Sequence, residues 1–516
     1  ALLHGVTGSG KTEIYIHLIA RTLAEGRDVL VLVPEIVITS QLVERLERIF
    51  EGRTTTYHSR LTPLRRGETF LRLASSAGGE LIVGVRSAIF LPMKRPGLIV
   101  VDEEHDANYK QTDPTPRYNA RDMAVVMGRI YGAKVVLGSA TPSLESLYNA
   151  TTGKYAYIEL TERWGEAVLP EIIVSDTIRA VKRGERKTHF NFDLLNDISR
   201  TLAAKEQVML FQNRRGYSPY IQCRTCGYSP RCPHCNVTLT QHKASSRMEC
   251  HYCGYTAPVP RACPQCNTVD IKPMGFGTEK VEEAIAALFP TARVARLDRD
   301  TSTSESAYNR IIGAFESGQT DILVGTQMIT KGFDFGRVSV VGVLNADNLL
   351  NSPDFRSSER AFQLMTQVAG RAGRRESEGV VIIQTSEPDN PVIGWVARGD
   401  YDAMARCELA DRHAFSYPPY SRLFQLTMRC DDLTLLRQGA LFLADAMRAK
   451  FGRRVAGPVA PPIDKIRGQY IVRIMLKIEN GRSMARAREL LREALAQFGA
   501  EKEFKTINIA IDVDAQ

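Results

Sequence analysis

The hydrophobic residues of this chain follow two alternating patterns, and together they predict an α/β protein. Short, almost continuous apolar runs, typical of strands buried in a parallel sheet, occur at residues 29–33, 81–85, 98–101 and 135–137. Helical spacing follows Lys11, where apolar side chains recur every three or four residues until Gly26. We therefore expect a first α/β domain over residues 1–148.

The same alternation returns after a polar and basic stretch between Leu160 and Val208, which we interpret as the passage into a second domain. The strands predicted for this domain lie at residues 208–211, 293–297, 321–324, 338–344 and 379–384. They predict a second α/β sheet, and we place the second domain at residues 149–408.

The last part of the chain, residues 409–516, has a different order of elements. Strands are predicted near Val455 and at residues 423–430, 470–478 and 507–513, and helices at residues 433–451 and 483–498. The resulting order is strand, helix, two strands, helix, strand. It matches the split β-α-β pattern of ferredoxin-like α+β domains.

A glycine-rich stretch near the start, GVTGSGKT from Gly5 to Thr12, matches the phosphate-binding template G-x-x-x-x-G-K-[ST]. Gly5, Gly8 and Gly10 allow a tight turn that points backbone N–H groups inward, and the following helix adds its positive N-terminal dipole. Lys11 then pairs with the β- and γ-phosphates, and the hydroxyl of Thr12 ligates Mg²⁺. The alternative is a glycine-rich turn of another α/β protein, but the setting between an apolar lead-in and a helix favours nucleotide binding.

Acidic residues follow the third apolar run directly, in the sequence Asp102-Glu103-Glu104-His105. In P-loop enzymes an acid at the end of a buried strand holds Mg²⁺, and a neighbouring glutamate orients and deprotonates the attacking water. Asp102 and Glu103 fit these two roles; a surface acidic turn is the alternative. Residues 138–141, Gly-Ser-Ala-Thr, place small hydroxyl side chains at the end of the next run.

Eight of the ten cysteines form four C-x-x-C pairs within an insertion at residues 221–269. The eight are Cys223, Cys226, Cys232, Cys235, Cys250, Cys253, Cys263 and Cys266. Glycine or asparagine follows each pair, and these two residue types best tolerate the left-handed conformation of a tight metal-binding turn. Eight thiolates suit two structural, tetrahedral Zn²⁺ ions; an iron–sulfur cluster is the alternative, and the spacing leaves open which pairs share a metal.

Four further residues are assigned no metal. His234 and His251 lie inside the C-x-x-C pairs, and we expect them to face solvent because eight thiols are already available as ligands. Cys407 and Cys430 stand apart from the pairs, and we interpret them as buried apolar thiols.

The composition favours a polyanionic partner. Among 516 residues, lysine and arginine number 67 against 58 acidic residues, which gives a net charge of +9. No apolar run is long enough to span a membrane, and no signal-peptide pattern begins the chain, so we expect an intracellular protein without a membrane partner. Because the chain starts at Ala1 and the P-loop at Gly5, too early for a complete first strand, we expect the sequence to be the back part of a longer protein.

Five blocks follow one another in the order found in superfamily 2 helicases and translocases, which the chain therefore resembles. They are GVTGSGKT, DEEH, GSAT, the pair Gly325-Thr326-Gln327 and Lys331-Gly332-Phe333-Asp334, and QVAGRAGR from Gln367 to Arg374. With the eight-cysteine insertion and the stretch NADNLLNSPDFRSSERAFQLMTQVAGRAGR at residues 345–374, the chain resembles the PriA family of bacterial replication-restart helicases.

This resemblance covers nearly the whole chain and implies a fold and a nucleotide site. The fold would be two tandem RecA-like lobes, at residues 1–148 and 149–408, with a double zinc ribbon inserted in the second lobe. A ferredoxin-like, S10-like domain at residues 409–516 would help to bind branched DNA and single-stranded DNA-binding protein. The residues implied to bind and hydrolyse ATP·Mg²⁺ are Gly5, Gly8, Gly10, Lys11, Thr12, Asp102 and Glu103 from the first lobe and Asp334, Gln367, Arg371 and Arg374 from the second. Closure of the cleft between the lobes would then be the mechanical step.

The resemblance also implies residues that contact DNA. The DNA backbone is assigned to Arg86, Ser87, Thr326 and Gln327. Family members carry an aromatic, basic loop after DEEH that couples single-stranded DNA to hydrolysis, and in this chain its residues are Tyr109, Lys110, Arg117 and Tyr118. The loop departs from the family at residues 112–116, where many relatives carry a Trp or Phe, and a solvated loop tip is the alternative for its tyrosines.

In the family, the outer cysteine pairs (Cys223, Cys226, Cys263, Cys266) share one zinc, and the inner pairs (Cys232, Cys235, Cys250, Cys253) share the other. The implied function is that of a 3′→5′ DNA helicase of the bacterial nucleoid, a monomer, which remodels stalled forks. Its implied partners are branched and single-stranded DNA, single-stranded DNA-binding protein, PriB, DnaT, and the replicative helicase with its loader. The alternatives are a double-stranded DNA translocase, an RNA helicase, and a fork-binding assembly platform with a weak or idle ATPase.

Overall fold

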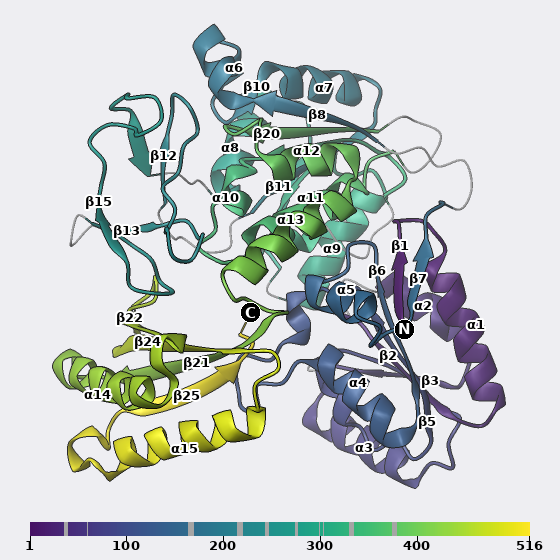
Figure 1. Ribbon diagram of the computed structural model, residues 1–516. Coiled ribbons are helices and arrows are strands. Elements are labelled where there is room, and N and C mark those ends of the chain that lie inside the picture. The colour runs from purple at the N-terminus through teal and green to yellow at the C-terminus, as the bar shows by residue number, and fades with distance from the viewer. Residues whose placement is uncertain are drawn as a thin grey trace.

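The computed structural model of the protein describes residues 1–35, 40–58, 60–163, 170–213, 220–242, 247–273, 277–298, 300–302, 304–329, 335–373 and 379–515. Within these residues the chain forms two α/β lobes, a cysteine-rich insertion and a C-terminal α+β domain (Figure 1). The predicted fold class is confirmed. Among the described residues, no helix is both long and apolar enough to cross a membrane.

The first lobe is built on a seven-stranded parallel sheet. Its strands, in spatial order, are β3 (Thr54–Tyr57), β4 (Leu81–Gly84), β2 (Asp28–Leu32), β5 (Pro96–Asp102), β6 (Lys134–Ser139), β1 (Leu2–Gly5) and β7 (Tyr157–Leu160). Its helices are α1 (Lys11–Ala24), α2 (Ser40–Ile49), α3 (Pro63–Ser75), α4 (Ala120–Tyr131) and α5 (Leu144–Thr151), and its 3₁₀ turns are η2 (Arg86–Phe90) and η3 (Ala107–Tyr109). β7 extends the sheet of this lobe beyond the boundary that we expected at residue 148.

The predicted apolar runs form the centre of this sheet because both of its faces are covered. In β2, Leu30 and Leu32 pack into the core on one face, and Val29 and Val31 pack into the core on the other. All four side chains are almost inaccessible to solvent. A strand with two buried faces needs apolar residues at every position, which explains why these runs are continuous rather than alternating.

The second lobe contains a six-stranded parallel sheet. Its strands, in spatial order, are β17 (Val294–Leu297), β18 (Ile322–Gly325), β11 (Gln207–Gln212), β19 (Val338–Leu344), β20 (Val380–Thr385) and β8 (Glu171–Asp176). Its helices are α6 (Thr177–Arg183), α7 (Phe192–Ala203), α8 (Thr278–Leu288), α9 (Glu305–Glu316), α10 (Asp347–Leu350), α11 (Ser357–Ala369), α12 (Pro391–Arg398) and α13 (Tyr401–Ala414), with the small hairpin β9 (Arg186–Lys187) and β10 (Phe190–Asn191). As in the first lobe, buried clusters cover both faces of the sheet.

The cysteine-rich insertion leaves the second lobe after β11 and returns before α8. It contains the antiparallel pair β12 (Ile221–Cys223) and β16 (Ile271–Pro273) and the small sheet β13 (Thr240–His242), β14 (Arg247–Glu249) and β15 (Thr256–Pro258). In Figure 1 it lies to the left of the second lobe and above the C-terminal domain.

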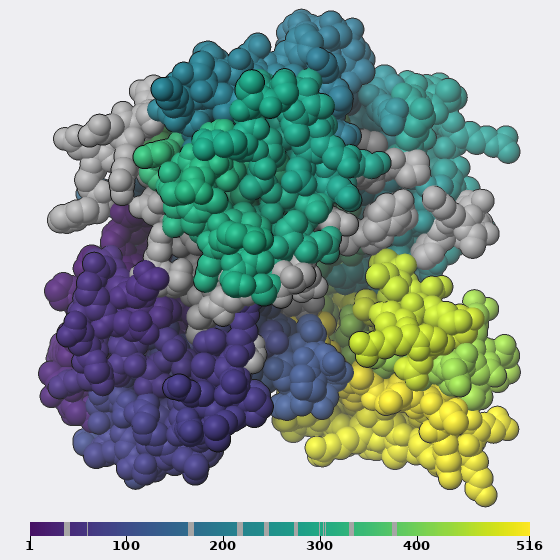
Figure 2. Space-filling view, turned by 180° about the vertical axis from the view of Figure 1, so that it is seen from behind, coloured from purple at the N-terminus to yellow at the C-terminus, as the bar shows by residue number. Residues whose placement is uncertain are grey.

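The C-terminal domain has the predicted order of elements. Its antiparallel sheet contains β22 (Val455–Val459), β24 (Gln469–Glu479), β21 (Ser421–Cys430) and β25 (Asn508–Val513), and the short β23 (Lys465–Ile466) pairs with β24. Helices α14 (Leu433–Phe451) and α15 (Met484–Ala500) pack on the sheet through one apolar core. Figure 2 shows this domain, in yellow, beside the first lobe and below the second.

Candidate nucleotide site and zinc centres

The phosphate-binding loop connects β1 to α1. Gly8 and Gly10 have φ angles of 82° and 85°, a left-handed backbone that favours glycine, and Gly10 forms the N-cap of α1. A Cβ atom added to Gly5 would lie 2.5 Å from the Ser9 side chain, so the start of the loop has no room for one. The loop thus has the tight form that the glycine spacing predicts.

Lys11 folds back over this loop. Its Nζ atom donates hydrogen bonds to the carbonyl oxygens of Gly5 (2.6 Å) and Val6 (3.4 Å). Burial lowers the pKa of Lys11, while the carboxylates of Glu103 and Asp102 act in the opposite direction. The ammonium group therefore sits in a partly desolvated position at the mouth of the loop, where phosphate oxygens would be stronger acceptors than two carbonyls.

Asp102 lies at the carboxyl end of β5, facing the start of α1. Its carboxylate accepts a hydrogen bond of 3.0 Å from the hydroxyl of Tyr15, a buried residue of α1. Burial, and next the charge of Glu103, raise the pKa of Asp102 to about 6. Among the described residues, the buried Oε2 atom of Glu103 has no hydrogen-bond partner, and Nδ1 of His105 lies 3.6 Å from it. Thr12 lies three residues before Tyr15 in the first turn of α1 and carries a hydroxyl. Asp102, Glu103 and Thr12 together offer only oxygen donors, which fits Mg²⁺.

Glu104, the second glutamate of DEEH, is a buried structural residue that we did not predict as part of the site. Its carboxylate accepts hydrogen bonds from the backbone N–H (2.6 Å) and hydroxyl (2.9 Å) of Ser143 and from the hydroxyl of Ser146 (2.7 Å). Arg121 pairs with the same carboxylate at 3.2 Å. Glu104 therefore caps the start of α5, immediately after the GSAT block, and fixes that block relative to DEEH.

His105 joins the two lobes. Its Nδ1 atom lies 2.8 Å from the hydroxyl of Ser139 in the first lobe, and its Nε2 atom lies 3.0 Å from Nε2 of Gln367 on α11 of the second. A single imidazole thus connects the DEEH, GSAT and QVAGRAGR blocks. His105 makes these contacts close to Asp102 and Glu103, at the end of β5. A shift of Ser139 or of Gln367 would therefore also move the segment that carries these two carboxylates.

One face of α11 carries three residues, spaced four apart, whose side chains form hydrogen bonds with the first lobe. Glu359 accepts a hydrogen bond of 2.9 Å from the backbone N–H of Leu144, and Gln363 donates one of 3.2 Å to the carbonyl of Thr141. Gln367, one turn further on, makes the contact to the imidazole described above. Residues four apart lie on the same side of a helix, so this face follows the first lobe over two turns.

The end of α11 leads to the phosphate-binding loop. A Cβ atom added to Gly370 would lie 3.5 Å from the Thr7 side chain, which places the start of GRAGR against the loop of the other lobe. Arg371 follows directly in the chain. Arg374, Asp334 and the rest of the predicted block at residues 331–334 lie outside the described residues.

Buried charges reinforce the same seam between the lobes. Glu145 of α5 pairs with Arg356 at 3.2 Å and with Arg412 of α13 at 3.6 Å. Burial raises the pKa of Glu145, but the guanidinium groups of Arg356, Arg412 and Arg121 outweigh this effect and bring the pKa down to about 2. Arg412, which is only 1% exposed, also pairs with Glu359.

The predicted backbone-binding residues lie at the edge of the seam. Arg86 and Ser87 belong to η2, and Arg86 donates a hydrogen bond of 3.1 Å to the carbonyl of Asn108. Gln327 lines a small surface pocket together with His105 and residues of α11, whereas Thr326 is almost buried. Whether these residues contact DNA stays a prediction.

The structure corrects two of the four residues predicted in the loop after DEEH. Tyr109 is fully buried, and its hydroxyl donates to the carbonyls of Asp102 (2.6 Å) and Leu32 (2.9 Å). Lys110 is 5% exposed and pairs with Asp512 of the C-terminal domain. Neither side chain is available to DNA in this conformation. Tyr118 stays half-exposed and meets Phe90 edge to face, with 4.7 Å between the ring centroids.

The four C-x-x-C pairs come together as two clusters. The outer cluster contains Cys223, Cys226, Cys263 and Cys266, and the inner cluster contains Cys232, Cys235, Cys250 and Cys253. This is the pairing that the family resemblance implied. Three pairs of sulfur atoms, Cys223–Cys266, Cys226–Cys263 and Cys232–Cys253, lie 3.6 Å apart, and all the sulfur atoms of one cluster lie within 4.8 Å of one another. Tetrahedral zinc with bonds of about 2.3 Å separates its sulfur ligands by about 3.8 Å, so both clusters fit the metal.

All four pairs form the same turn. In each, the residue after the second cysteine donates its N–H to the carbonyl of the first cysteine, at 2.8 to 2.9 Å. These residues are Gly227, Asn236, Gly254 and Asn267, with φ angles between 52° and 80°. The left-handed turns expected from glycine and asparagine are therefore present at every pair.

The remaining histidine and cysteine assignments are partly wrong. His251 does not face solvent, because it is 8% exposed and its Nδ1 atom lies 2.7 Å from the carbonyl of Ala460 in the C-terminal domain. It belongs to neither cysteine cluster. Cys430 is buried as expected, but Cys407 is exposed.

Family models of helicases match both lobes. The DEAD/DEAH box helicase model matches residues 1–150, and the helicase conserved C-terminal domain model matches residues 266–376. Two narrower models match further segments: the PriA DNA helicase Cys-rich region domain at residues 232–258 and the primosomal protein N C-terminal domain at residues 413–516. Fold and site together define a two-lobed P-loop protein of the helicase class.

Individual relatives narrow this class. The chain is 41% identical over 515 residues to the replication restart protein PriA of Bacillus subtilis, 39% over 478 residues to that of Rickettsia conorii and 38% over 517 residues to that of Haemophilus influenzae. These alignments cover 99%, 92% and 100% of this chain and 63%, 73% and 69% of the relatives, respectively. The chain belongs to the PriA family, and it spans 63% of the length of the Bacillus relative.

Among solved structures, a structure of RecG bound to a three-way DNA junction aligns with a TM-score of 0.46 and 16% sequence identity. The alignment covers 79% of this chain and 43% of the RecG chain. A likeness of this size carries no argument about function.

Replacing Glu359 with Gln tests the buried charges of the seam. The change removes the nearer of two carboxylates that pair with the buried guanidinium of Arg412 and leaves Glu145 at 3.6 Å, so we expect a loss of about 3 kcal/mol of stability, measured by urea unfolding. The matched control is Glu489→Gln, which removes an exposed ion pair with Arg486 and should cost less than about 1 kcal/mol. Equal effects of the two substitutions would contradict this role of Glu359.

Single cysteine substitutions test the two metal centres. Cys226→Ser and Cys250→Ser each remove a ligand from a different cluster, so we expect each to halve the zinc bound per chain, measured by atomic absorption after gel filtration. Cys407→Ser, outside both clusters, should leave the zinc content unchanged. Full zinc content in either cluster variant would show that the cluster is not a four-thiolate site.

Proposed function

We propose that this chain is an ATP-driven 3′→5′ DNA helicase that binds and unwinds branched or stalled replication forks and starts primosome assembly for replication restart. Its family membership supports this function. The observation that carries it is the stripe of contacts on α11, which runs from the start of α5 to the phosphate-binding loop. Groups from both lobes thereby approach one site, as hydrolysis coupled to lobe movement requires.

In this proposal the first lobe holds the nucleotide. The backbone of the loop from Gly5 to Thr12 surrounds the phosphates, and Lys11 exchanges its carbonyl partners for phosphate oxygens. Thr12 and Asp102 hold Mg²⁺, which neutralises charge on the β- and γ-phosphates when bound. Glu103, whose Oε2 atom accepts no hydrogen bond from the described part of the chain, orients and deprotonates the attacking water.

The second lobe completes the site when the cleft is closed. Gln367 keeps α11 in register through His105 of the DEEH block, and Arg371 and Arg374 stabilise the charge that develops on the γ-phosphate. Asp334 helps to hold the nucleotide. Because these groups belong to a different lobe from Lys11, opening of the cleft stops hydrolysis and closing permits it.

Single-stranded DNA runs along the seam between the lobes. Arg86, Ser87, Thr326 and Gln327 contact its backbone, and Arg117 and Tyr118 contact the strand at the edge of the first lobe. The net charge of +9 supports a polyanionic partner. The zinc ribbons, with one Zn²⁺ in each cluster, form a rigid surface for the emerging duplex or for partner proteins.

As partners we propose single-stranded DNA-binding protein and the primosome proteins PriB, DnaT, the replicative helicase and its loader. The protein would act as a monomer on the bacterial nucleoid. These partners follow from the family, whose relatives are named replication restart proteins.

Steady-state ATP hydrolysis, with and without a forked DNA that carries a single-stranded arm, tests the motor. We expect fork DNA to stimulate hydrolysis at least tenfold, and Lys11→Ala to abolish it because the phosphates lose their main counter-charge. Fork binding measured on the same samples completes the test. Tight fork binding with hydrolysis no faster than in Lys11→Ala would identify an assembly platform instead of a motor.

Tyr118→Ala tests the remaining aromatic contact of the loop. If the ring stacks on a base, the variant should bind single-stranded DNA more weakly by about 1–3 kcal/mol in fluorescence anisotropy. The control is Tyr131→Ala, which removes a ring on α4 that is 50% exposed. Similar affinity of the two variants would assign Tyr118 to the solvated loop tip.

A further inference from the structure

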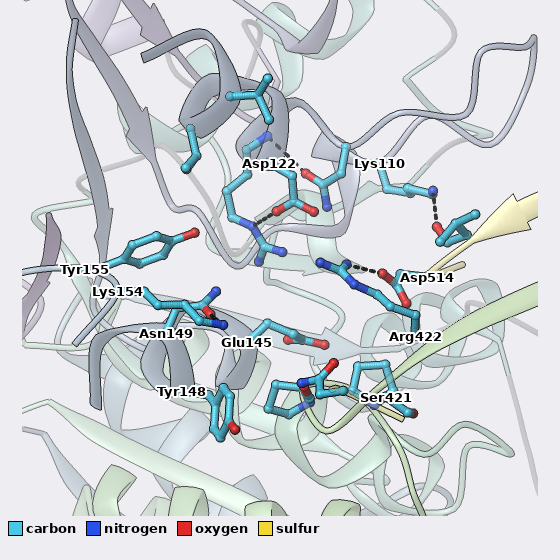
Figure 3. Close-up of a pocket in the computed structure, with 18 of the residues that line it drawn as sticks. Lys110, Asp122, Glu145, Tyr148, Asn149, Lys154, Tyr155, Ser421, Arg422 and Asp514 are labelled. Carbon is cyan, nitrogen blue, oxygen red and sulfur yellow. Dashed lines mark hydrogen bonds and ion pairs between the residues drawn. The ribbon is translucent and has the colours of Figure 1, made fainter. Parts of the chain in front are cut away.

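Lys110 forms a buried junction between the first lobe and the C-terminal domain. Its Nζ atom lies 2.7 Å from Oδ1 of Asp512 and donates hydrogen bonds to the carbonyls of Val513 (2.8 Å) and Arg117 (3.0 Å). Two of these three partners belong to β25, about four hundred residues further along the chain. Figure 3 shows Lys110 at the edge of the cleft between the two domains, reaching towards that strand.

The residue before Lys110 is attached to the nucleotide site. The hydroxyl of Tyr109 donates to the backbone carbonyl of Asp102 at 2.6 Å and to that of Leu32 at 2.9 Å. Both residues are buried, so their side chains have little room to move independently of these partners. Neighbouring residues thus bind the end of β5 on one side and the last strand of the protein on the other.

Hydrogen bonds restrict the backbone around Tyr109 and Lys110. Tyr109 ends η3, and the carboxylate of Asp106 accepts a hydrogen bond from the N–H of Asn108 at the start of this turn. The backbone of Lys110 itself forms an antiparallel bridge with Asn119, and the N–H of Gln111 donates to the carbonyl of Tyr118 at 2.8 Å. The connection from Asp512 to Asp102 therefore passes through two side chains and one short, hydrogen-bonded turn.

A second ion pair at the same cleft shows what the Lys110 contact adds. Arg422 pairs with Asp514, but both residues belong to the C-terminal domain, and the side chain of Arg422 is 54% exposed. That pair does not cross the cleft. The Lys110–Asp512 pair crosses it with side chains that are 3% and 12% exposed. Screening by solvent and salt is weak at such burial, so the position of β25 bears directly on Lys110.

We propose that Lys110 and Asp512 are positioning residues through which the C-terminal domain sets the geometry of the magnesium-binding end of β5. When the C-terminal domain engages branched DNA, its last strand, held to Lys110, fixes Tyr109 and with it Asp102. The response of ATP hydrolysis to forked DNA therefore depends on this pair. The inference rests on the proposed ATPase and deepens it by naming the route from the C-terminal domain to the site.

The test compares Asp512→Asn and Lys110→Met with Lys110→Arg, which keeps the positive charge and the donors. For the first two variants we expect at least a fivefold loss of fork stimulation and at least a threefold rise in the Mg²⁺ concentration that gives half-maximal hydrolysis. The dissociation constant for fork DNA should stay within twofold of that of the unaltered chain. Lys110→Arg should recover most of the stimulation, and Asp514→Asn, at the exposed pair, should behave like the unaltered chain.

A structural role alone predicts a different pattern. If the pair only docks the C-terminal domain, Asp512→Asn and Lys110→Met lower the melting temperature but leave the magnesium dependence and the stimulation ratio of the folded protein unchanged. That result would overturn the proposal. If Lys110→Met does not fold, Asp512→Asn, which keeps the shape of the side chain, decides the question.

A second measurement separates failure of this proposal from failure of the proposed function. A fluorescent ADP analogue, titrated with Mg²⁺ in the absence of turnover, reports the magnesium site directly. If the unaltered chain does not hydrolyse ATP, the ATPase proposal fails, but a threefold or greater weakening of magnesium-dependent binding in Asp512→Asn still supports the coupling. Unchanged magnesium-dependent binding in both variants overturns it.

Discussion

The two lobes meet at the start of α5, where the backbone N–H groups of a buried helix end need hydrogen-bond acceptors other than water. The first N–H groups of any helix lack partners within the helix, and here a carboxylate from each lobe supplies them. Glu104 accepts from Ser143, and Glu359 accepts from Leu144. Each carboxylate is in turn paired with a buried arginine, Arg121 or Arg412. Removing one carboxylate weakens the balance of buried charge at this end of α5, so these contacts favour the arrangement of the lobes that the structure shows.

The other two parts of the protein attach next to this cap, through the short segment that precedes α11. Arg356 donates to the carbonyl of Ala515, at the end of the C-terminal domain. The ring of Phe355 stacks on that of Tyr417 with 4.2 Å between centroids, and Tyr252 of the cysteine-rich insertion packs edge-on against both. The two lobes, the insertion and the C-terminal domain therefore all make contacts around the segment that precedes α11. The helix that begins there ends at the phosphate-binding loop, so a displacement of any part bears on the nucleotide site.

The sequence predicted most of the elements and the metal clusters because their signals are local. Strands that are buried on both faces appear in the sequence as continuous apolar runs. Metal-binding turns appear as C-x-x-C followed by glycine or asparagine. Tyr109 and Lys110 were assigned wrongly for the opposite reason. The family resemblance assigned this aromatic and basic loop to DNA, and no residue near it in the sequence shows that β25 covers Lys110 or that Tyr109 turns inwards to Asp102. The role of Glu104 was missed likewise, since its arginine and serine partners are distant in sequence.

The candidate nucleotide site holds one ammonium group and two carboxylates partly out of water. Lys11 donates to carbonyl oxygens, and burial, with the charge of Glu103, raises the pKa of Asp102 to about 6. In the proposed function, a nucleotide with its metal would supply both counter-charges together, phosphate for the ammonium and a cation for the carboxylates. The contacts of α11 already align the second lobe with the first. In this arrangement of the lobes, a bound nucleotide would therefore add charge to the site rather than cause a large rearrangement of the chain.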